Sequence, residues 1–143
     1  MRRVYGCDVC QEVCPRNNIK KSEVFPRDEF LELIAKDFSL PELLCGSPEF
    51  YKTRVYPIMY NYINELKYFK RNAAIAMGNT GEEAYMPHLI SELTNSEALV
   101  RQHVAWAIGK IGGSKAKQAL ENRLAYEDSP EAAQEIKMAL NNI

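Results

Sequence analysis

The sequence has no long apolar run and no excess of charge of either sign. No segment approaches the ~18 consecutive apolar residues that a membrane-spanning helix needs, and no apolar stretch follows the basic residues at the start. The 143 residues carry 18 Lys and Arg against 19 Asp and Glu, a net charge of -1 that excludes bulk attraction to nucleic acid. With 46% hydrophobic and 26% charged residues, the composition predicts a soluble, cytoplasmic protein without membrane contact.

Cysteine is scarce, but three of the four cysteines stand close together at Cys7, Cys10 and Cys14. Disulfides are not expected, because the spacing is tight and no export signal precedes it. The run ends in Pro15 and matches the last three members of the C-x2-C-x2-C-x3-C-P run whose thiolates ligate 4Fe-4S clusters. It therefore predicts Cys7, Cys10 and Cys14 as iron-sulfur ligands, with a zinc site or a redox dithiol as the alternatives.

The number of thiols limits this prediction. Val4 occupies the place of the first cysteine of the run, and the cysteine before the proline, Cys14, would reach across to a second cluster. Cys45 lies beside two leucines, where a small buried hydrophobic residue is commoner than a ligand. We expect clusters to be absent or incomplete in this chain by itself.

Helical periodicity begins at Pro26. Apolar residues at 30, 33, 34 and 38 share one face and predict a helix over 26–38. Between 39 and 66, prolines and a glycine favour short helices.

An internal repeat follows, because residues 69–81 align with residues 100–112. Apolar, basic, alanine and glycine positions coincide, so each unit reads as a helix, a Gly-x-x-Gly turn and a second helix. A last helix opens with Ser129 as its N-cap and Pro130 in its first turn. The pattern resembles HEAT-like repeats and predicts an all-α helical solenoid of about five helices over 67–142, with an antiparallel bundle as the alternative.

The repeat also predicts roles for individual residues. Alanines should let neighbouring helices approach closely, and glycines should adopt the left-handed conformations that end a helix. We expect Lys70, Arg101 and Lys117 on the surface and Trp106 in the core. The alanines are Ala74, Ala76, Ala105 and Ala107, the glycines are Gly78, Gly81, Gly109 and Gly112, and the other expected core residues are Met77, Leu89, Leu93, Val104, Ile108, Leu120 and Leu124.

Basic residues are concentrated in residues 51–71 and 101–117, and the second segment contains no acid. Stacking of the repeats should gather some of them on one face with few acids among them, where they would bind phosphates. These candidate nucleic-acid-binding residues are Lys67, Lys70, Arg71, Arg101 and Lys110. The alternative is a solvated face whose cations pair with Glu82, Glu83 or Glu92.

Three segments together, YGCDVCQEVCPRN, FKRNAAIAMGNTG and VRQHVAWAIGKIGG, closely resemble the C-terminal part of epoxyqueuosine reductases. Members of that family join a cobalamin-binding region, a two-cluster ferredoxin-like module and a HEAT-like domain, and reduce epoxyqueuosine to queuosine in the tRNA anticodon. The resemblance makes Cys7 and Cys10 ligands of one 4Fe-4S cluster and Cys14 a ligand of the other. Arg16 departs from the tryptophan that some relatives carry after the Cys-Pro pair.

The resemblance implies three regions: a remnant of a ferredoxin-like iron-sulfur module at 1–25, connecting helices at 26–66 and a HEAT-like repeat domain at 67–143. We therefore expect a C-terminal fragment, with no catalytic residue of its own and no activity alone. Cobalamin would enter only through an N-terminal region, and the expected partners are a tRNA anticodon stem-loop and the remainder of the same polypeptide. The alternatives are a non-catalytic HEAT-like interaction module and an electron-transfer iron-sulfur protein that does not act on tRNA.

Overall fold

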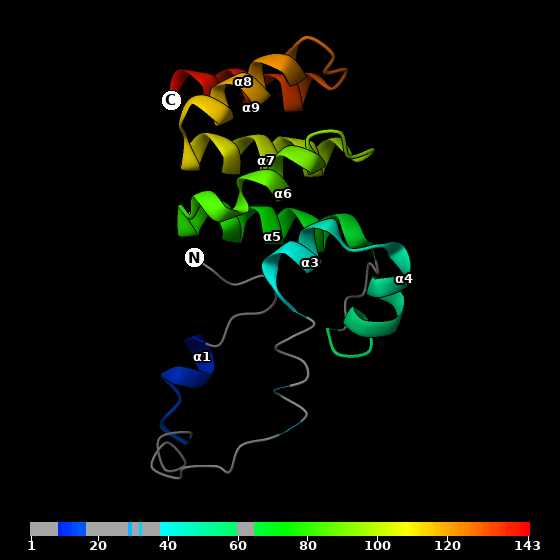
Figure 1. The fold of residues 1–143 in the computed structure, drawn as a ribbon. Coiled ribbons are helices and arrows are strands. Elements are labelled where there is room, and N and C mark those ends of the chain that lie inside the picture. Colours follow the sequence, from blue (N-terminus) through cyan, green and yellow to red (C-terminus); the bar gives the residue numbers. More distant parts are fainter. Residues whose placement is uncertain (1–8, 17–28, 30–31, 33–37, 60–64) are drawn as a thin grey trace.

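The computed structural model describes residues 9–16, 29, 32, 38–59 and 65–143. All regular elements within these ranges are helical, which confirms the all-α prediction, and Figure 1 shows most of them stacked in layers. No helix in the described ranges is both long enough and apolar enough to cross a membrane.

Short helices occupy the described part of 39–66, as predicted, and residues 60–64 lie outside the described residues. The first turn of α3 is closed by Ser39, whose Oγ accepts the N–H of Glu42 at 3.3 Å while Glu42 Oε2 accepts the N–H of Ser39 at 3.4 Å. The helix predicted over 26–38 lies mostly outside the described residues. The elements are α1 (Val9–Glu12), α3 (Leu40–Cys45), α4 (Pro48–Phe50) and a π-helical turn (Tyr51–Val55).

Five further helices form the repeats and confirm the predicted number. They are α5 (Leu66–Thr80), α6 (Met86–Glu92), α7 (Ala98–Ile111), α8 (Ser114–Leu124) and α9 (Pro130–Asn141). The long helices form a row in which α5 packs on α7 and α7 packs on α9, and the shorter α6 and α8 pack against this row (Figure 1). A 3-10 turn, Glu83–Tyr85, leads into α6.

The ends of the repeat helices follow the predicted signals. Gly81 after α5 and Gly112 after α7 have φ angles of 71° and 73°, which side chains other than glycine rarely adopt. At the start of α9, Ser129 Oγ accepts the N–H of Ala132 at 3.3 Å, and Pro130 occupies the first turn.

Gly78 and Gly109 have a different role, and the prediction that they end helices is wrong. Both lie inside helices, at the points where neighbouring long helices cross. A Cβ atom at Gly78 would lie 2.9 Å from Cα of Ala107, and one at Gly109 would lie 2.7 Å from Cβ of Ala139. Glycine is needed at these positions because the backbones approach closely, not because of their φ angles.

The core follows the repeat. The alanines and apolar residues predicted inside are buried, except Leu124, which is half-buried against the core, and Lys117 is exposed as expected. Two predictions of surface exposure are wrong, because only 7% of Lys70 and 5% of Arg101 is exposed. Trp106 is half-buried and packs against the core from its edge.

An aromatic cluster joins the short helices to the first repeat. Tyr51 is fully buried, and its ring centroid lies 5.7 Å from that of Phe69 on α5 and 6.2 Å from that of Tyr56. The Tyr51 hydroxyl donates to the carbonyl oxygen of Leu43 in α3. This cluster forms the end of the core next to α3.

Candidate nucleic-acid interface

The five predicted phosphate-binding residues come from two helices that pack side by side. Lys67, Lys70 and Arg71 lie on α5, and Arg101 and Lys110 lie on α7. Burial divides the group: Lys110 is exposed, Lys67 and Arg71 are half-buried, and the other two are buried.

Lys70 is held inside the first repeat by a carboxylate of the same repeat. Its Nζ lies 3.3 Å from both carboxylate oxygens of Glu92, at the end of α6. The side chains are 9% and 13% exposed, so the ion pair is largely shielded from solvent. Glu92 also accepts a hydrogen bond from the Asn95 side chain. The positive charge of Lys70 is thus neutralised within the chain.

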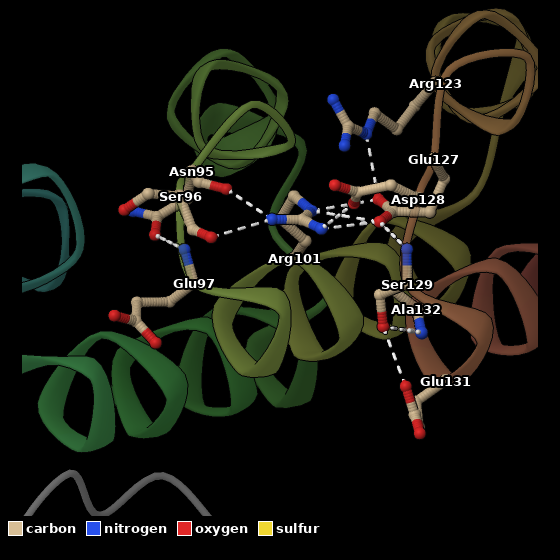
Figure 2. Close-up of polar contacts among 10 residues, drawn as sticks. All are labelled: Asn95, Ser96, Glu97, Arg101, Arg123, Glu127, Asp128, Ser129, Glu131 and Ala132. Atoms are coloured by element: carbon tan, nitrogen blue, oxygen red, sulfur yellow. Dashed lines mark hydrogen bonds and ion pairs between the residues drawn. The ribbon is translucent and has the colours of Figure 1, made fainter.

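Arg101 occupies the equivalent place in the second repeat and is held by more groups (Figure 2). Its Nη2 donates to Glu127 Oε1 and to Asp128 Oδ1, both at 2.6 Å, and its Nε donates to Glu127 Oε2 at 2.9 Å. Its Nη1 donates to the carbonyl oxygens of Asn95 and Ser96 at 2.8 and 3.0 Å. All three guanidinium nitrogens are therefore engaged with the loops before α7 and after α8.

Glu127 lies at the centre of this network (Figure 2). Its fully buried carboxylate also accepts hydrogen bonds from Arg123 Nε and from the Ser129 N–H, both at 2.9 Å. Burial alone would raise the pKa of Glu127, but the hydrogen bonds from Arg101, Arg123 and Ser129 outweigh it and lower the pKa to about 2. The carboxylate is consequently ionised at neutral pH, as an ion pair inside the protein requires.

The expectation of one basic face with few acids is therefore wrong for Lys70 and Arg101. Each faces carboxylates from the second helix of its repeat or from the loop that follows it. Since these side chains point inward, they stabilise the repeats and present little charge to solvent.

The three remaining cations differ in availability. Lys67 pairs with Glu65 and lies 4.0 Å from Glu97, and the hydrogen bond with Glu65 raises the pKa of Lys67. The Arg71 guanidinium lies 5.2 Å from the centre of the Tyr68 ring. Among the described residues, no carboxylate pairs with Arg71 or Lys110. Arg71 and Lys110 are thus the candidates with charge left for a phosphate.

Two hollows flank Trp106, a residue that the sequence predicted to lie in the core and for which it predicted no cavity. A cavity of about 380 Å³ is lined by Trp106, Gly109, Lys110, Glu135, Ala139 and Asn142. A second, of about 270 Å³, is lined by Ile75, Gln102, His103, Trp106 and Glu135. The signal for this surface was the stripe of polar residues that shares a face of α7 with Trp106.

The cysteine run is only partly described. Cys7 lies outside the described residues, Cys10 is exposed on α1, and Cys14 is half-buried after it, both as free thiols. No group of three or more His, Cys, Asp or Glu residues in the described ranges could hold a metal ion. Two free thiols suit ligation but do not complete the four-thiolate set of a 4Fe-4S cluster.

Cys45 was expected to be buried, and this is wrong. It is exposed at the end of α3, with its Sγ 3.9 Å from the carbonyl oxygen of His88 and 3.9 Å from Ser91 Oγ. Among the described residues, Cys45 belongs to no group of three or more His, Cys, Asp or Glu side chains that could hold a metal ion.

Comparison with known proteins gives a consistent result. A family model described as HEAT repeats matches residues 63–141. Epoxyqueuosine reductases of Bacillus cereus and Bacillus subtilis are 32% and 34% identical to the chain over 96% of its length, and the chain spans 36% of each. A crystal structure of epoxyqueuosine reductase with an epoxyqueuosine-modified tRNA-Tyr stem loop matches 98% of this chain and 37% of that one, with a TM-score of 0.79 and 29% identity. The chain thus spans about a third of the length of the curated relatives it matches.

Proposed function

We propose a function on the premise that this chain belongs to the HEAT-repeat family and matches the C-terminal part of epoxyqueuosine reductases. The chain serves a tRNA-modifying reductase that converts epoxyqueuosine to queuosine. Its repeats contribute a surface that holds a tRNA anticodon stem-loop, and its cysteine run contributes cluster ligands. Catalysis itself depends on groups that this chain does not contribute.

The observation that carries the proposal is the likeness to the reductase crystallised with a tRNA stem loop. The match extends over 98% of the chain, which includes the basic residues and the cysteine run as well as the repeats. A likeness limited to the helices would support only the fold, since many functions share one fold.

The exposed cations supply the contact with RNA in this proposal. Arg71 on α5 and Lys110 on α7 bind phosphates, and Lys67 joins them when its pairing with Glu65 opens. Lys70 and Arg101 support this surface from inside by fixing the helices that carry it. Few phosphate contacts are available, so binding by this chain is weak and depends strongly on salt.

The cysteines serve electron transfer in this proposal. Cys7 and Cys10 would bind one 4Fe-4S cluster and Cys14 the other, and such clusters supply electrons one at a time. Cobalamin would be bound by a region that this chain does not include. The thiols of this chain would hold and orient the iron, while further ligands come from elsewhere in the reductase.

Charge reversal tests the RNA contact. Arg71→Glu with Lys110→Glu should weaken binding of an anticodon stem-loop RNA and flatten the slope of log affinity against log salt by roughly 1.4–1.8. The matched control is Lys115→Glu with Lys117→Glu, which makes the same change of charge at exposed positions on α8, outside the α5–α7–α9 row. Equal losses in the two pairs, or none in either, would contradict the assignment.

A non-catalytic interaction module is the second candidate. It is favoured by the burial of Lys70 and Arg101, which removes two of the five predicted phosphate contacts. A chain with intact helices that binds no stem-loop RNA at low salt would support this candidate over the first.

A further inference from the structure

We propose that the two hollows beside Trp106 receive an unpaired nucleobase of the bound RNA, stacked on the indole ring. This inference rests on the proposed function and deepens it, because it adds recognition of a base to binding of the phosphate backbone. Sequence-specific contacts with RNA are commonly made to unstacked bases of loops, which aromatic side chains receive.

Trp106 is placed to act as a stacking surface. It lies in the middle helix of the α5–α7–α9 row and is only half-buried, so part of its ring remains accessible. Its Cζ3 lies where α5 comes closest, 2.8 Å from the position that a Cβ at Gly78 would take. The glycine leaves room for the indole, and the packing restricts its movement.

Polar groups surround the indole in both hollows. His103 Nδ1 lies 2.9 Å from the Leu99 carbonyl oxygen, which can only accept, so Nδ1 donates this hydrogen bond and Nε2 is left for another partner. Gln102 adds an amide in the smaller hollow, and Asn142 adds another in the larger one. The hollows thus combine one aromatic ring with several hydrogen-bonding groups, the two features by which proteins hold an unstacked base.

Glu135 favours a base over a phosphate at this place. It lines both hollows and forms no ion pair with another described residue, so its negative charge repels phosphate. A carboxylate accepts hydrogen bonds from the N–H groups of a base edge. Guanine presents two such groups side by side, N1–H and the 2-amino group, which match the two carboxylate oxygens. We therefore expect guanine to bind best.

The phosphates of the same nucleotide have cations nearby. Lys110 lines the larger hollow, and Ile75, which lines the smaller one, follows Arg71 by one helical turn on α5. The proposed base site and the proposed phosphate contacts thus adjoin on one surface.

Fluorescence tests the inference directly, because Trp106 is the only tryptophan in the chain. Stem-loop RNAs that differ only in the loop, with guanine, adenine or an abasic site at each position in turn, are titrated into the full chain. Binding is followed both by anisotropy of a labelled RNA and by tryptophan emission. We expect quenching with the intact loop, and for one loop position a loss of affinity of about 5- to 150-fold when its base is removed.

Two variants separate stacking from folding. Trp106→Phe keeps an aromatic ring and should retain part of the affinity, whereas Trp106→Leu should reduce it to that of the abasic RNA while circular dichroism shows unchanged helix content. Glu135→Gln should lower the preference for guanine over adenine and leave binding of the abasic RNA unchanged or stronger.

Each outcome is decisive. RNA that binds without quenching, or equally well with every base of its loop removed in turn, overturns the base site while the phosphate surface stands. A correctly folded chain that binds none of the RNAs at low salt contradicts the proposed function itself. Quenching together with a base-dependent affinity supports both.

Discussion

Arg101 and Glu127 form a two-point ion pair between α7 and the loop after α8. Nη2 of the arginine lies 2.6 Å from Oε1 of the glutamate, and Nε lies 2.9 Å from Oε2. The side chains are 6% and 0% exposed, so neither charge is well solvated. The same guanidinium holds the carbonyl groups of Asn95 and Ser96, and the pair therefore connects the edges of two successive repeats.

Removing one member of this pair should destabilise the chain strongly. Glu127→Ala leaves the Arg101 charge buried beside fewer acceptors, and we expect a loss of about 3–5 kcal/mol in the free energy of unfolding, measured with urea. Asp128→Ala is the matched control. The Asp128 side chain is 84% exposed, so its loss should cost less than about 1 kcal/mol. Similar effects of the two substitutions would show that burial does not determine the strength of the pairing.

Acid should weaken the same network. The folded state lowers the pKa of Glu127 from 4.5 to about 2, so its contribution is complete above pH 4.5 and is lost as the pH falls towards 2. We expect the difference in unfolding free energy between the wild type and Glu127→Gln to shrink over this range. Denaturant titrations at several pH values measure it, and a difference independent of pH would contradict the assigned pKa.

A methyl group at the crossing of α7 and α9 should force the helices apart. In Gly109→Ala the new Cβ would meet Cβ of Ala139 at 2.7 Å, and we expect a cost of about 1–3 kcal/mol in thermal or urea unfolding. Gly81 provides the comparison, since a Cβ there has open space but a strained φ of 71°. Asparagine tolerates that conformation better than alanine. Gly81→Asn should therefore recover stability relative to Gly81→Ala, whereas Gly109→Asn should be worse than Gly109→Ala.

The Tyr51 hydroxyl should stabilise the packing of α3 against the repeats. Tyr51→Phe leaves the buried Leu43 carbonyl without this donor, and we expect a loss of about 1–3 kcal/mol on chemical unfolding. Tyr126→Phe makes the same change at a residue that is 82% exposed and should have no measurable effect. An unchanged stability in Tyr51→Phe would mean that the carbonyl finds another donor.

The helical repeat was predictable because its signals are local. Apolar spacing and helix ends at Gly81, Gly112 and Ser129 each depend on a few neighbouring residues, and the alignment of the two units adds independent support. Gly78 and Gly109 were misassigned because glycine serves two purposes. Whether it supplies a positive φ or a close approach depends on the helix packed opposite, which the sequence of one helix does not contain.

The inward orientation of the two buried cations was also encoded but overlooked. Arg101 precedes Val104, Ala105 and Ile108 at spacings of three, four and seven residues, which places it on the core face of α7. Lys70 stands in the same relation to the core residues of α5. A count of charges along the chain hides this, because it registers the sign of a residue and not the side of the helix on which it lies.

The hollows beside Trp106, in contrast, could not be predicted from the sequence of its own helix. Its helical position borders the core, so the prediction of packing was reasonable, and the ring does contact the core. The hollows beside it depend on how far apart α7 and α9 are and on the side chain of Glu135, which lies 29 positions later in the chain. Such a site arises only once the helices are assembled.

The bonds of Arg101 also decide where the repeats can tolerate extra residues. Loops between helices usually accept insertions readily. The loops before α7 and after α8 are tied to one guanidinium, so an added residue in either would pull a carbonyl or a carboxylate out of reach. At Gly113, by contrast, a Cβ would meet nothing within 4 Å, so the α7–α8 turn has room for added residues as long as glycine keeps the φ of 92° at this position. We therefore expect the α7–α8 turn to accommodate changes of loop length during divergence, as well as tags or circular permutation in the laboratory. The loops before α7 and after α8 should reject them.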